Sequence, residues 1–254
     1  MGDGVNHSEK PASETSRKMS TASVTTGAAS PAWRKFGRLA ELVLILGLVF
    51  FFWEGKAFTP LRLLVVFFHE ASHAIVAWLT GGQVREMVVN AREGGHVLAV
   101  GGNRFLTLNA GYLGSLFWGA AVYSAASVSR FDRVVMGVLA VAVAALSLFF
   151  ARGLFSHVFG IGTALAMILA ARYLGEGLND FLLRLIGLTS MVYVPHDIYS
   201  DTIARSSILS DARLLAREYG GATVLWGAAW LAVSLVLILS CLVSSMKNGA
   251  DRND

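Results

Sequence analysis

Hydrophobic residues gather in seven long runs along the chain, and short polar connections separate the runs. A helix needs about 20 mainly apolar residues to cross a membrane, and most of the runs approach that length. The runs cover residues 39–53 (with a start near 36), 58–80, 106–126, 134–151, 154–173, 181–194 and 223–245. This pattern predicts an all-α polytopic membrane protein with six to seven transmembrane helices.

One stretch after the second run breaks the helical pattern. Residues 84–90 and 96–100 favour two short strands, and the residues between them include Gly94 and Gly95. We therefore expect a small β-hairpin on the cytosolic side. Its exposed edge could pair with an extended substrate, for which Val97 and Val100 are candidate contacts. The alternative is a plain connecting hairpin.

The two ends of the chain differ from its middle. Residues 1–32 are rich in small and polar residues and have almost no large apolar side chains, so we expect a disordered N-terminal tail. Residues 33–246 form a single multi-pass membrane domain in this interpretation. Residues 247–254 are predicted to be a polar C-terminal tail.

Composition and charge support a membrane protein. Hydrophobic residues make up 55% of the chain and charged residues 15%, whereas soluble domains carry about 25% charged residues. The lysines and arginines lie in connections between apolar runs, which argues against nucleic-acid binding and for a topological role. Their bias predicts a cytosolic N-terminus. With one cysteine, Cys241, the chain can form neither an intramolecular disulfide nor a thiolate zinc cluster.

The second apolar run carries an HExxH motif, His69-Glu70-Ala71-Ser72-His73. Positions i and i+4 of a helix lie on the same face, so His69 and His73 can bind one zinc ion. Glu70 is placed to take a proton from a metal-bound water. Because ionisable groups are costly in an apolar span, they mark a functional site. We predict an intramembrane zinc metalloprotease with Glu70 as the catalytic base.

A catalytic zinc usually has three protein ligands, and the motif supplies two of them. The candidates for the third are Asp197, Asp201, His196 and His157. We favour Asp197, with Asp201 as the second choice, because a carboxylate also lowers the net charge of a buried ion. Both aspartates have an alternative role as interfacial caps or ion pairs.

The start of the third run is rich in small residues, with Gly111, Gly114, Ser115 and Gly119 at spacings that allow close helix packing. Asn109 precedes them and is a candidate for holding the backbone or the oxyanion of a substrate. Pro195, near the end of the sixth run, predicts a helix break.

Taken together, these features resemble the site-2 protease group of intramembrane metalloproteases, in particular the B-like branch of peptidase family M-fifty. The stretches that carry the resemblance are 69–74, the glycine-bounded hairpin 81–102, 110–115, 197–203 and 210–212. It implies zinc-dependent peptide hydrolysis in the membrane, of the kind that serves regulated intramembrane proteolysis, with Glu70 as the base and an aspartate as the third ligand. The chain lacks the Leu-Asp-Gly and Asn-x-x-Pro motifs of the broader group around Asp197.

Two functions from different classes follow. In the first, the protein hydrolyses peptide bonds of membrane-embedded substrates inside the lipid bilayer, with Zn²⁺ as its cofactor. In the second, it is a catalytically inactive or non-proteolytic membrane protein of the same fold, a scaffold or a metal-ion transporter. Few other charges lie within the predicted spans, which disfavours transport.

Overall fold

The computed structural model describes residues 1–4, 31–53, 55–205 and 209–248. The predicted tails, 1–32 and 247–254, lie almost entirely outside the described residues and stay predictions. The long helices are α1 (Pro31–Phe51), α2 (Thr59–Leu79), α3 (Arg104–Val128), α4 (Asp132–Phe150), α5 (Leu154–Tyr173), α6 (Glu176–Tyr199) and α8 (Thr223–Asn248). The short elements are η1 (Lys56–Phe58), η2 (Ser200–Ala204), α7 (Asp211–Tyr219), β1 (Gln83–Asn90) and β2 (Gly94–Val100).

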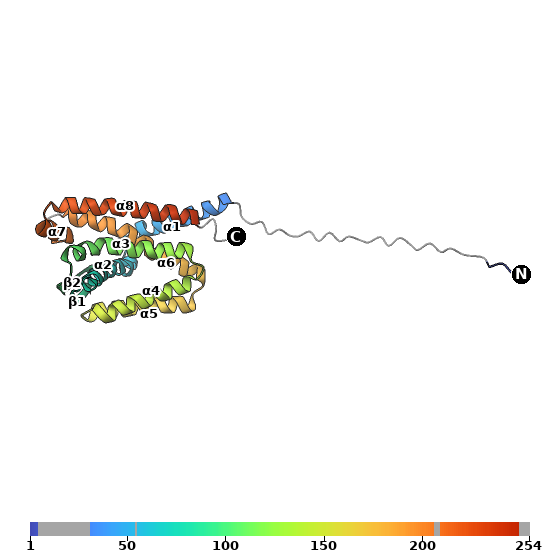
Figure 1. Ribbon diagram of the computed structural model, residues 1–254, viewed down its shortest axis with the longest axis horizontal. Coiled ribbons are helices and arrows are strands. Elements are labelled where there is room, and N and C mark those ends of the chain that lie inside the picture. Colours follow the sequence, from blue (N-terminus) through green and yellow to red (C-terminus); the bar gives the residue numbers. More distant parts are fainter. Residues whose placement is uncertain (5–30, 54, 206–208, 249–254) are drawn as a thin grey trace.

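The helices form a bundle in which α3, α4, α5 and α8 run nearly parallel to its long axis (Figure 1). Within the described residues, five helical segments are long and apolar enough to cross a membrane: 56–79, 104–128, 132–150, 154–173 and 223–245. In α1 the apolar part is shorter, Leu42–Phe51. The polytopic all-α fold and the small hairpin are confirmed. The expected six to seven spans are reduced to five among the described residues, because the apolar part of α1 is short and α6, which contains the run 181–194, carries charged side chains such as Arg184 and Asp197.

Helix α3 packs against α2 and α6 through its small residues. A Cβ atom on Gly114 would overlap the side chain of Ser72 on α2. A Cβ atom on Gly119 would lie 2.6 Å from Ser190 Cβ and 3.0 Å from the carbonyl oxygen of Gly187, both on α6. The small residues of α3 therefore serve close helix packing, as their spacing predicts.

The hairpin lies along α2. Its strands pair antiparallel, and Met87 and Val89 of β1 are fully buried. At its turn, Glu93 forms a 2.7 Å ion pair with Arg62 in the first turns of α2, whereas β1 begins just beyond the C-terminal end of that helix. The outer edge of β1 is occupied, since the backbone of Val89 exchanges two hydrogen bonds with Ser156 Oγ on α5.

The predicted break at Pro195 is wrong. Helix α6 continues through Pro195 to Tyr199, and the irregular turn follows as the π-helix η2. The backbone N–H of Arg205 donates to the carbonyl of Ser200 there. Such π turns are frequent at functional sites, and this one carries Asp201.

We expect Gly119→Ala to destabilise the protein and Gly137→Ala to leave it as stable or more so. The added methyl group at 119 must displace α6, at a typical cost of about 1–3 kcal/mol. Nothing lies within 4 Å of the Cβ position of Gly137 on α4, and alanine is favoured over glycine in a helix by about 0.5–1 kcal/mol. Thermal unfolding in detergent measures both; equal melting temperatures for the two variants would contradict the packing described here.

Candidate metal centre

The HExxH residues lie on one continuous helix. Pro60 stands at the start of α2, and the helix ends at Leu79, before Thr80 and a glycine with positive φ, Gly81 (+87°). The i, i+4 spacing places the His69 and His73 imidazoles on the same face, with their Nε2 atoms 3.1 Å apart. The structure thus brings the two predicted histidine ligands together.

Helix α3 orients both rings. His73 Nδ1 lies 2.6 Å from the carbonyl oxygen of Thr107, and a carbonyl can only accept, so Nδ1 carries a proton and Nε2 is the ring atom left to bind a metal. This carbonyl–histidine arrangement is the usual second contact of metal-binding histidines. The His69 ring lies edge-on to Tyr112, with ring centroids 4.7 Å apart.

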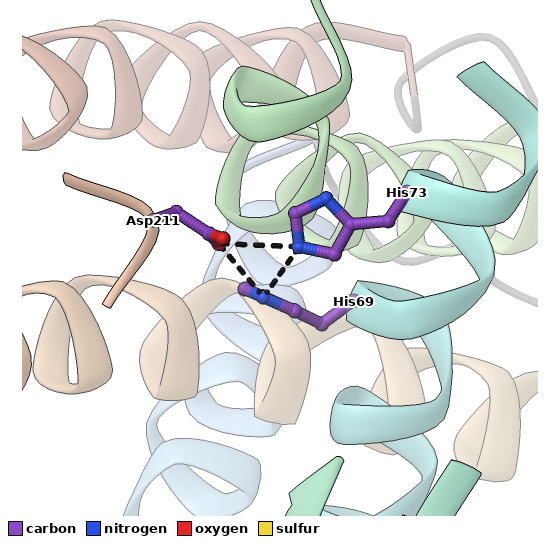
Figure 2. Close-up of side chains that lie close together, drawn as sticks. All are labelled: His69, His73 and Asp211. Atoms are coloured by element: carbon purple, nitrogen blue, oxygen red, sulfur yellow. Dashed lines mark hydrogen bonds and ion pairs between the residues drawn. The ribbon is translucent and has the colours of Figure 1, made fainter. Parts of the chain in front are cut away.

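The third side chain at this point is the carboxylate of Asp211. Its Oδ2 lies 3.2 Å from His69 Nε2 and 3.1 Å from His73 Nε2 (Figure 2). One ligand atom from each of these three residues lies within 4.8 Å of the others. Ligands about 2.0–2.2 Å from a tetrahedral zinc are about 3.3 Å from one another. The three spacings therefore fit a zinc ion, and the two nitrogens and one oxygen are donors that zinc accepts.

Asp211 is the first residue of α7. The hydroxyl of Ser210 caps this helix by accepting a hydrogen bond from the backbone N–H of Arg213. Ala212 and Leu215 anchor the helix, since both are fully buried. Burial alone raises the pKa of the Asp211 carboxyl, but the adjacent His73 and His69 outweigh it and hold the pKa below its ordinary value.

The absence of a side chain at Gly111 leaves space for the two imidazole rings. A Cβ atom at this position on α3 would lie 2.5 Å from His69 Nε2 and would also overlap His73 Nε2. Only a residue without a side chain lets the backbone of α3 approach the two rings this closely. Gly111 therefore belongs to the centre, although it offers no ligand atom.

Glu70 is buried and lies against the hairpin. A Cβ atom on Gly95 of β2 would lie 2.6 Å from Glu70 Oε1, so the β2 backbone passes directly beside this carboxylate. A cavity of about 460 Å³ opens at the same place. Its walls include the three possible metal ligands and Glu70, residues of β2, and polar groups of α3, α6 and η2.

Asp197 and Asp201 lie on the cavity wall but outside the group formed by His69, His73 and Asp211. Asp201 accepts a hydrogen bond from Tyr112 (2.9 Å) and another from Arg205 (2.7 Å). Among the described residues, the side chain of Asp197 forms neither a hydrogen bond nor an ion pair. The structure therefore brings Asp211, rather than the favoured Asp197, to the histidine pair.

The other candidate third ligands, His196 and His157, do not line the cavity. The ring of His196 packs against Trp53, with centroids 5.3 Å apart. His157 is hydrogen-bonded within its own helix, with Nδ1 3.0 Å from the carbonyl oxygen of Gly153.

Of the three candidate substrate contacts, one lies on the cavity wall and two do not. Val97 lines the cavity. Val100 lies at the exposed end of β2 and is not on the cavity wall. Asn109 is not on the wall either, because its side chain links helices: its amide oxygen accepts a hydrogen bond from Trp230 Nε1 of α8 at 2.9 Å.

Sequence reasoning did not select Asp211. The signal was present, since Ser210-Asp211-Ala212 starts a short amphipathic helix and contributes to the family resemblance. An acidic residue in the first turn of a helix is also common for purely local reasons, because it complements the helix dipole. The local pattern therefore indicates a helix start and carries no information about a metal.

Comparison with known proteins gives one match. A model of the family described as Peptidase M50B-like matches residues 42–241 of the 254 residues, and this range contains every side chain of the centre. No curated protein and no solved structure matches the chain. Because the family model covers well over half of the sequence, the chain belongs to the Peptidase M50B-like family.

Proposed function

We propose that this protein is an intramembrane zinc metalloprotease in which His69, His73 and Asp211 hold the zinc ion and Glu70 is the general base. The observation that carries the proposal is the convergence of three donor atoms beside Glu70, on the wall of one cavity. Membership of a peptidase family and the five apolar helices support a protease and an integral membrane protein. We retain a cytosolic N-terminus as part of the proposal.

Zinc, when bound here, would polarise the scissile carbonyl and make a water molecule acidic near neutral pH. The chain's own groups do the rest. His69, His73 and Asp211 supply three ligands, which leaves the open position that a catalytic site needs. Thr107 and Tyr112 hold the two imidazoles in place.

Glu70 is the group suited to proton transfer. It neighbours His69 in the sequence, and its carboxylate faces the β2 backbone at Gly95. A peptide lying along β2 would have its scissile bond beside Glu70. The carboxylate would accept the proton of the attacking water and deliver it to the leaving amine.

The second strand offers the place for an extended substrate. One edge of β2 pairs with β1, and five of its residues, Gly94 to Val97 and Ala99, line the cavity. Since the outer edge of β1 is occupied by Ser156, β2 is the strand to which a substrate could add. A transmembrane substrate would have to unwind locally first, because helical carbonyls are hydrogen-bonded within the helix.

Metal analysis tests the ligand set. We expect His69→Ala, His73→Ala and Asp211→Asn to lower zinc affinity by more than about 100-fold, since loss of a single hydrogen bond to a metal ligand already costs about 10–100-fold. Asp197→Asn and Asp201→Asn should keep one zinc per chain. Metal content of the purified proteins and competition with a chelator measure this. Zinc retained by Asp211→Asn but lost from Asp197→Asn would reject our ligand set in favour of Asp197.

The role of Glu70 is tested separately. Glu70→Gln should keep its zinc and lower the rate of cleavage of a membrane-embedded substrate by about 10²–10⁴-fold, because the general base is lost. Cleavage is followed in lipid nanodiscs by mass spectrometry of the products. Unchanged cleavage would reject the mechanism. No cleavage by zinc-loaded wild type, over a broad set of substrates, would favour the non-proteolytic alternative.

Gly111 provides a test that changes no ligand. We expect Gly111→Ala to weaken zinc binding by about tenfold or more, because the methyl group must push α3 or the imidazoles out of place. The matched control is Gly162→Ala on α5, where nothing lies within 4 Å of the added Cβ. Equal zinc affinities for the two variants would show that α3 does not confine the rings.

A further inference from the structure

Most charged side chains on the cavity wall have a partner of opposite charge. Glu93 pairs with Arg62 at 2.7 Å. Arg104 pairs with Glu218 at 3.2 Å. These pairs are complete without a ligand, and the cavity contents need not neutralise them.

The pair beside Asp197 is complete as well. Arg205 also lines this wall, and its Nη2 lies 2.7 Å from Asp201 Oδ1 and 2.8 Å from Ser200 Oγ. The second carboxylate oxygen of Asp201 accepts from Tyr112. Neither Arg205 nor Tyr112 forms a hydrogen bond with Asp197.

Among the described carboxylates on the cavity wall, Asp197 is the one left without a partner or a proposed role. Asp211 faces the histidines, and Glu70 has the role of the base. Asp197 stands in the last turn of α6, lines the same cavity and lies within electrostatic range of His69. Within the described part of the chain its side chain has no hydrogen-bonding or ion-pairing partner, so its carboxyl group faces the space that a substrate would enter.

An unpaired carboxylate is costly where water is scarce, and a cation placed against it is strongly favoured. A cavity of about 460 Å³ is in the usual range of ligand-binding pockets and has room for several side chains of a bound peptide. The same cavity contains the proposed metal ligands, so a substrate side chain that pairs with Asp197 would lie in the cavity where the scissile bond is placed.

We propose that Asp197 is a specificity-determining residue that selects membrane segments with a lysine or arginine next to the bond to be cut. The preference for binding a basic residue is inferred from the cavity alone. That the bound segment is also cleaved rests on the proposed function. A basic residue is rare inside a membrane span. Such a requirement would therefore restrict the protein to few transmembrane segments.

Binding and cleavage are measured separately. The probes are synthetic transmembrane peptides of leucine and alanine with one central lysine, methionine or glutamate, reconstituted in lipid nanodiscs with the full chain. Binding is measured on the zinc-loaded Glu70→Gln protein, where the peptides stay intact. Glu70→Gln/Asp197→Asn and Glu70→Gln/Asp197→Lys are the test variants. Glu70→Gln/Glu176→Gln, altered at the far end of the same helix α6, is the matched control.

We expect the lysine peptide to bind about tenfold or more tightly than the methionine peptide to Glu70→Gln and to the Glu176 control, in line with the gain from a desolvated charge pair. Asp197→Asn should remove the preference, and Asp197→Lys should transfer it to the glutamate peptide. Equal binding of the lysine and methionine peptides to Glu70→Gln would overturn the inference. So would loss of zinc from the Asp197→Asn protein, since Asp197 would then be a ligand.

Cleavage by the protein with its native Glu70 distinguishes the two proposals. If the lysine peptide is bound preferentially but no peptide is cut, the proposed protease function fails and the charge selectivity stands. If all peptides are cut and bound equally well, the protease function stands and the selectivity fails.

Discussion

The contact between α2 and α3 at Gly111 and Gly114 is the constraint on which the rest of the site depends. Both positions have too little space for a side chain, because His69, His73 and Ser72 lie against the α3 backbone. The close approach turns α3 into a support for the imidazoles. It brings the Thr107 carbonyl to His73 and the Tyr112 ring to His69. In a membrane, where helices gain little from hydrophobic association, such close packing is a main source of stability.

The candidate centre is assembled from three parts of the chain. Helix α2 supplies the histidines and Glu70, β2 supplies a backbone edge, and α7 supplies Asp211. The position of Asp211 depends on the anchoring of a nine-residue helix. This helix is joined to the start of α3 by the Arg104–Glu218 pair and by the Phe105–Tyr219 ring contact. Support for Asp211, the third candidate ligand, thus comes from the same helix, α3, that orients the two histidines.

The hairpin is asymmetric in a way that suits its proposed role. The two-stranded sheet has two outer edges, and the β1 edge is covered by α5 through Ser156. The Arg62–Glu93 pair holds the turn against the first turns of α2. With one edge covered and the turn held, β2 is left as a fixed strand beside Glu70. Most of its residues between Gly94 and Ala99 lie on the cavity wall.

The sequence by itself determined the features that depend on local spacing. Runs of apolar residues located the helices, alternation located the hairpin, and the i, i+4 rule placed His69 and His73 on one face. Asp197 and Asp201, the two aspartates that the sequence analysis proposed as third ligands, do line a common cavity. Local spacing could not show that Tyr112 and Arg205 donate hydrogen bonds to Asp201, or that Trp230 donates one to Asn109.

Only the tertiary structure decided which carboxylate meets the histidines. Asp211 reaches them because α6 continues past Pro195, the chain turns through η2, and α7 docks on α3 and α8. Each of these steps depends on packing between elements far apart in the sequence. A helix rule relates residues a few positions apart, whereas the distance between α2 and α7 is set by how the whole bundle closes.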